Sequence, residues 1–155
     1  MVTMAGKQTK LVDALNSLIE LAFDAIEAYQ AAISRTSRPD DKQELTAFMG
    51  DHERHTRELA PHVARLGGTA KHKGDFKAVL TKGKVQIAGL VGDRAILMAM
   101  KTNEDDTNAA YEFATQRTDI DNEELRSLLH ANLSDERKHR AWLERRITEG
   151  ERPRV

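Results

Sequence analysis

Residues 135–144 read DERKHRAWLE, and within them Glu136 and His139 are separated by three positions. In a helix, this spacing places both side chains on one face, one turn apart. The surrounding apolar residues repeat at helical spacing and form one stripe: Leu125, Leu129, Leu143 and Ile147. Glu136 falls in the middle of that stripe and His139 on its flank. Because a carboxylate in a core is costly unless it is paired, protonated or bound to metal, the sequence predicts a buried Glu–His pair or a metal site.

A second group of candidate ligands lies in the stretch DHERH at residues 51–55, which contains His52 and His55. His52 is central to another apolar stripe at helical spacing, and His55 lies at its edge. This stripe consists of Leu45, Met49, Leu59 and Val63. The acids of the same helix fall on other faces and are expected to be solvated: Asp51, Glu53 and Glu58.

A third segment, NEDDT at residues 103–107, supplies the candidate partner of Glu136. The periodicity places Asn103 on the buried side of its helix and Glu104 on the flank. The midpoint between Glu104 and Glu136 falls in a predicted loop, so we expect the two carboxylates to face one another at a similar height. Tyr111 lies two turns after Glu104 on the same side, where its hydroxyl could donate to the carboxylate.

Four long helices are predicted, at residues 10–35, 41–66, 93–116 and 122–149, with a crossover at 67–92 that contains a short helix. The break before the second helix lies at residues 36–40, and Asp40 or Asp41 is expected to cap that helix. Two helical hairpins joined by one long crossover have the topology of an all-α, ferritin-like four-helix bundle. We expect residues 1–155 to form a single domain.

An internal repeat at a shift of 84 residues supports the two-hairpin interpretation. The shift pairs Glu20 with Glu104, Leu45 with Leu129, Asp51 with Asp135, and His55 with His139. The repeat nominates Glu20 as a ligand from the first helix, whereas the helical wheel places Glu20 on the polar face and Ala22 inward. Because the wheel depends on more residues than the repeat does, we expect no ligand from the first helix.

The composition and the absence of certain motifs argue against several kinds of function. The 155 residues carry a formal net charge of −1, which gives no reason to expect nucleic acid as a partner. The absence of cysteine excludes disulfides, zinc–thiolate sites and iron–sulfur clusters, and it suits a cytoplasmic location. No stretch approaches 18 apolar residues, so we expect no membrane span. The sequence lacks a phosphate-binding loop and a dinucleotide fingerprint, so no organic cofactor is expected.

On residues 135–144 the chain resembles the ferritin-like superfamily, which includes bacterioferritin and rubrerythrin. It is more closely similar to a family of uncharacterised bacterial ferritin-like bundle proteins, on the segments 51–55, 74–77 and 103–107. The resemblance covers about residues 11–147 and identifies the fold better than the activity.

The resemblance implies ligand positions at Glu104, Glu136, His139 and His55. His52, which is central to its apolar stripe, is the fifth candidate ligand. His52 stands where the superfamily has a glutamate, and either Ala22 or Glu20 occupies the remaining position. These departures imply a depleted site that holds one metal ion more readily than two.

Two functions follow as expectations. The first is binding of iron, manganese or zinc by a mixed imidazole–carboxylate site in the bundle centre, within a protein that could form a homodimer. The second is a helical interaction or stress-related protein without catalysis, in which a buried Glu–His network is a remnant of such a site.

Overall fold

The computed structural model describes residues 4–73 and 81–151, and these residues contain helices and no strand. Five helices follow in order: α1 (Leu11–Arg35), α2 (Pro39–Arg65), α3 (Thr81–Ala88), α4 (Asp93–Thr115) and α5 (Glu123–Glu151). The all-α prediction is confirmed. The segment 74–77, which carries part of the family resemblance, lies outside the described residues.

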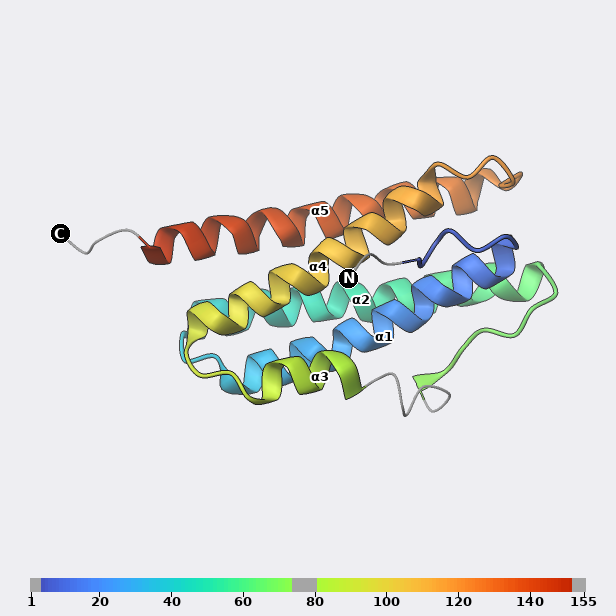
Figure 1. The fold of residues 1–155 in the computed structure, drawn as a ribbon. Coiled ribbons are helices and arrows are strands. Elements are labelled where there is room, and N and C mark those ends of the chain that lie inside the picture. The colour runs from blue at the N-terminus through green and yellow to red at the C-terminus, as the bar shows by residue number, and fades with distance from the viewer. Residues whose placement is uncertain (1–3, 74–80, 152–155) are drawn as a thin grey trace.

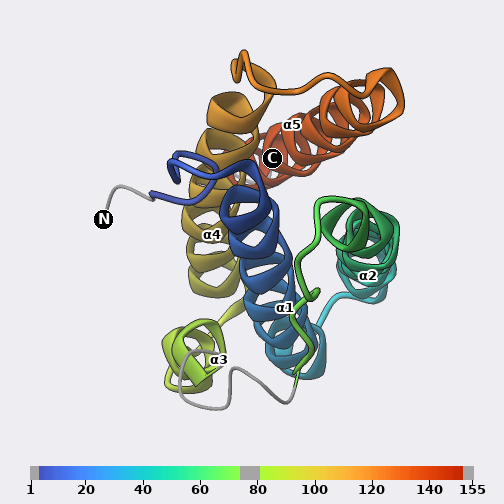
Figure 2. The same cartoon turned by 90° about the vertical axis from the view of Figure 1, so that its right-hand side faces the viewer.

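Two helical hairpins dominate the arrangement (Figures 1 and 2). The first consists of α1 and α2, and the second of α4 and α5. The hairpins meet mainly where α1 packs against α4, whereas α2 and α5 contact each other only sparsely. The short helix α3 packs on α1 beside the start of α4. No helix among the described residues combines the length and apolar character that a membrane span requires.

The N-terminus of α2 differs from the prediction. The N-cap residue is Arg38, and Pro39 occupies the first turn, where the missing proline N–H costs no helical hydrogen bond. The expectation that Asp40 or Asp41 caps this helix was wrong because both residues already lie within it. Asp41 is buried, and Arg146 of α5 donates to it from Nε at 2.6 Å.

The buried apolar side chains form two clusters that lie at different levels along the helices. One cluster includes Leu59 of α2, Ala110 of α4 and Leu133 of α5. The other includes Phe48 of α2 and Met100 of α4, together with Leu143 of α5. On each of these three helices, the buried residues between the two clusters are polar. The helices therefore enclose a polar layer with apolar packing on both sides.

Candidate metal centre

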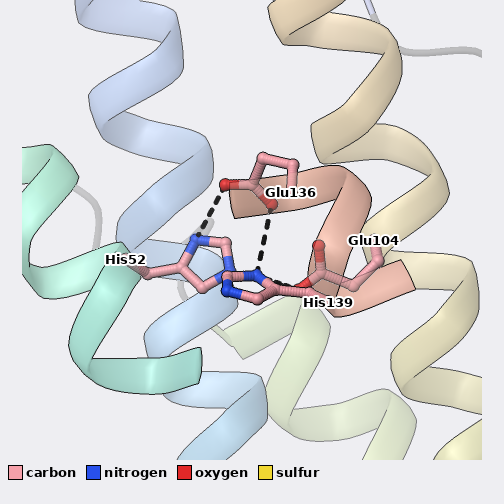
Figure 3. A group of neighbouring side chains, drawn as sticks. All are labelled: His52, Glu104, Glu136 and His139. Atoms are coloured by element: carbon pink, nitrogen blue, oxygen red, sulfur yellow. Dashed lines mark hydrogen bonds and ion pairs between the residues drawn. The ribbon is translucent and has the colours of Figure 1, made fainter. Parts of the chain in front are cut away.

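Four buried side chains converge in this polar layer: His52 from α2, Glu104 from α4, and Glu136 and His139 from α5 (Figure 3). One ligand atom of each lies within 4.8 Å of those of the others. All four side chains are at most 1% exposed. The spacing of three between Glu136 and His139 places both on the inner face of α5, as the sequence indicates.

The imidazole of His52 lies between two carboxylates. Its Nε2 is 3.2 Å from Glu104 Oε1, and its Nδ1 is 3.5 Å from Glu136 Oε1. The Nδ1 of His139 faces the same two carboxylates, at 3.5 Å from Glu104 Oε1 and 3.8 Å from Glu136 Oε2. The centre therefore alternates imidazole and carboxylate groups around a common point.

His55 lies next to this group, with its Nδ1 at 3.2 Å from Glu136 Oε1. Its Nε2 is 3.0 Å from Asp135 Oδ2 on α5. The converse pair joins His139 Nε2 to Asp51 Oδ2 on α2 at 2.8 Å. Each histidine is thus held by the aspartate of the opposite helix, and each turns its Nδ1 toward the centre. A carboxylate on the outer nitrogen is the usual support of a metal-ligating histidine.

The atoms that face the centre are suited to a cation. Neither oxygen of Glu136 makes a hydrogen bond, and neither do the Nδ1 atoms of His55 and His139, although all of these atoms are buried. Buried polar atoms that make no hydrogen bond are costly, even where ion pairs reach them as here. A metal ion at the centre would bind these atoms, so the residues present fit the group that the resemblance implies.

The carboxylates and imidazoles change one another's proton affinity. Burial alone would favour the neutral forms, but Glu104 and Glu136 raise the pKa of His139 to about 10. Burial also opposes the charge of His52, yet the same carboxylates raise its pKa. Despite burial, His52 and its neighbours hold the pKa of Glu136 well below the usual range. Without metal, the two carboxylates therefore favour the protonated form of His139 and of His52.

Glu104 is held by residues from two helices. Tyr29 of α1 donates a hydrogen bond from its hydroxyl to Oε1, and Thr107 donates to Oε2 at 3.0 Å. The sequence assigned the donor role to Tyr111, which was wrong, because the Tyr111 hydroxyl instead accepts from Asn132 at 3.3 Å. Burial and the adjacent Glu104 carboxylate raise the pKa of Tyr29 well above its ordinary value, so this hydroxyl remains a donor.

We expect Tyr29→Phe to lower the free energy of unfolding of the metal-free protein by about 1.5–3 kcal/mol, because a charged acceptor loses its donor in a buried site. Tyr111→Phe is the matched control, since it removes a hydroxyl whose hydrogen bond is with a neutral amide, that of Asn132. Its expected cost is about 0.5–1.5 kcal/mol. Urea denaturation followed by circular dichroism measures both values, and equal losses would contradict the role of Tyr29.

The structure brings four of the five predicted ligands into one group and places His55 against it. Glu104 is fully buried, whereas Asn103, which the wheel placed inward, is partly exposed. Glu20 is partly exposed and is not in the group.

The structure corrects the prediction for one aspartate near the site and adds a second aspartate to it. The expectation that Asp51 is solvated was wrong, because Asp51 turns toward His139. Asp135, its counterpart under the 84-residue repeat, was not recognised as a partner of His55. The repeat contained this signal, since it aligns both the two aspartates and the two histidines.

Comparison with known proteins gives one match. The family model described as "Domain of unknown function (DUF2383)" matches residues 10–117. The match includes His52, His55 and Glu104, but it ends before α5, which carries Glu136 and His139. No curated protein and no solved structure matches the chain.

Proposed function

The chain belongs to the family described as Domain of unknown function (DUF2383), and we propose that it is a ferritin-like bundle protein that binds one metal ion at its centre. The observation that carries the proposal is Glu136, a carboxylate at the core with two buried oxygens that form no hydrogen bond. The imidazoles around it present nitrogen atoms to the same point. A buried set of this kind is costly as a purely structural feature.

The proposed ligands are Glu104, Glu136, His139 and His52, with His55 as a further donor to the same ion. Mixed imidazole and carboxylate donors suit iron, manganese or zinc. His52 replaces a carboxylate of the superfamily pattern, and no carboxylate of α1 belongs to the group. This shortage of negative charge favours one ion over two. Iron held there would supply oxidation by dioxygen or peroxide, as the resemblance implies.

Metal analysis tests the proposal directly. The protein is purified without a histidine tag, stripped with a chelator, and reconstituted separately with iron(II), manganese(II) and zinc(II). We expect one of these metals to remain at close to one ion per chain after desalting, as measured by inductively coupled plasma mass spectrometry. Retention of less than about 0.2 ion per chain for all three metals would reject metal binding, because a preformed buried site binds tightly.

A non-catalytic interaction protein is the second candidate function. Ion pairs within the cluster favour it, because His52 and His139 already neutralise Glu104 and Glu136 without a metal. The same reconstitution separates the two candidates, since a remnant site retains no ion. A single domain, a homodimer and a cytoplasmic location remain parts of the proposal. Light scattering of the purified protein tests the oligomeric state.

A further inference from the structure

Arg54 of α2 bridges the two aspartates that support the central histidines. Its Nη1 donates to Asp51 Oδ1 at 3.2 Å, and its Nη2 donates a short hydrogen bond to Asp135 Oδ2 on α5. Its Nε also lies 3.5 Å from Glu58 Oε1. One guanidinium therefore links α2 to α5 and contacts both carboxylates at once, which its planar fork of donors allows.

These residues lie at successive depths between the surface and the centre. The side chain of Arg54 is 37% exposed, those of Asp51 and Asp135 are 24% and 28% exposed, and those of His55 and His139 are fully buried. Each layer contacts the next through an ion pair or a hydrogen bond. A continuous polar path thus runs inward from Arg54.

This path follows the boundary between α2 and α5, where the two hairpins contact each other only sparsely. Helices α2 and α5 contact each other more sparsely than the members of either hairpin do, or than α1 and α4 do. At the level of the centre, the α2–α5 boundary is bridged by charged and polar side chains, whereas apolar clusters pack above and below. A hydrated cation could exchange water for carboxylate oxygens along such a path, which an apolar boundary does not allow.

We infer that Arg54 is a positioning residue that covers the route by which a divalent cation reaches the centre. The inference rests on the proposed metal-binding function. The guanidinium repels an approaching cation and occupies the oxygens of Asp51 and Asp135 that the cation would contact first. It also fixes both aspartates, and through them the two histidines, so it slows the release of a bound ion.

Substitution of Arg54 separates this role from simple ligation. In Arg54→Ala, two partly exposed carboxylates remain at the mouth of the path without their cation. Acidic clefts raise the arrival rate of cations, so we expect the association rate of Co²⁺ to rise by about tenfold or more. We expect the release rate to rise as well, while the stoichiometry stays unchanged. Arg54→Gln keeps most of the side-chain length and is expected to behave in the same way.

The single tryptophan provides the readout. The ring of Trp142 lies 5.6 Å from that of Phe48, which in turn lies 4.2 Å from the ring of His139. Paramagnetic Co²⁺ at the centre should quench its fluorescence, so stopped-flow mixing with Co²⁺ measures association. Mixing the loaded protein with excess chelator measures release. The control is Arg140→Ala, which removes another half-exposed arginine of an interhelical ion pair, here with Asp105 of α4.

Three outcomes are distinguishable. Faster association and release in both Arg54 variants, with unchanged rates in Arg140→Ala, support the inference. Rates in the Arg54 variants equal to those of the native chain overturn it, while metal binding itself stands. Failure of the native chain to bind Co²⁺ or any metal in the reconstitution rejects the proposed function, and the inference falls with it.

Discussion

Glu136→Gln is expected to abolish stable metal binding, with retention falling from close to one ion per chain to less than about 0.2 after desalting. The substitution preserves the size of the side chain but removes its negative charge. Both carboxylate oxygens of Glu136 are buried and make no hydrogen bond, so this side chain has more unsatisfied acceptor capacity than any other central residue. An amide offers only one oxygen, and it adds two N–H donors that repel a cation.

Thermal unfolding provides a second measurement of the same variant. A ligand at 100 times its dissociation constant stabilises the folded protein by about 2.7 kcal/mol, so the native chain should melt at a higher temperature with metal than without it. Glu136→Gln should melt at one temperature under both conditions. In the metal-free state the variant should remain folded, because the neighbouring imidazoles can lose their protons when the carboxylate charge is removed.

Glu112→Gln is the matched control for this experiment. Glu112 lies on α4, is about half exposed, and contacts Arg137 at 3.9 Å on the surface. We expect this variant to bind metal and to gain stability from it as the native chain does. Metal retention by Glu136→Gln equal to that of the control would refute the assignment of Glu136, even if the protein binds metal elsewhere.

Helical periodicity was sufficient to find the central residues of α2 and α5. Each of these helices has an apolar stripe that is interrupted by polar residues, and the cost of burying His52 or Glu136 singles them out. Periodicity identified these buried polar residues because apolar clusters lie on either side of the layer, so the stripes continue beyond the polar positions in both directions. The sequence alone thus located most of the proposed site.

The partners of those residues were harder to predict because they depend on geometry between helices. A wheel treats each helix alone, and it placed Asp51 away from the core. In the structure, Asp51 reaches across the sparse α2–α5 boundary to His139. The hydroxyl donor of Glu104 depends on the same geometry, because Tyr29 is 75 residues away from it in the chain. A side chain at the edge of a stripe can point toward solvent or toward a neighbouring helix, and the partners that the neighbouring helix offers determine its direction.

Metal affinity is expected to rise steeply with pH between about pH 6 and pH 9. In the metal-free protein the two carboxylates raise the pKa of His52 and bring that of His139 to about 10, so the His139 imidazole carries a proton at neutral pH and His52 holds its proton more tightly than a free imidazole does. A histidine must lose its proton before it can bind a metal. Each displaced proton lowers the apparent dissociation constant by about tenfold per pH unit, so the proton on His139 alone gives a slope of about tenfold per unit. Competition with a chromophoric chelator at several pH values measures this slope.

The metal-free protein should show the opposite trend in stability. Because the folded-state pKa of His139 lies above its ordinary value of 6.5, the stabilisation from its ion pairs is complete below about pH 6.5 and is lost as the pH rises toward 10. The lowered pKa of Glu136 contributes stability that is lost only in acid, below the ordinary value of 4.5. Denaturation curves of the stripped protein should therefore show a decline in stability from neutral to alkaline pH.

Adding metal should reverse that decline, because the ion replaces the protons that leave His52 and His139. Calorimetric titration in two buffers with different ionisation enthalpies counts the protons released, and we expect at least about one per ion at pH 7. A pH-independent affinity with no proton release would show that the metal binds outside this cluster. Release of protons by the native chain but not by Glu136→Gln would link the bound ion to the centre where the four side chains meet.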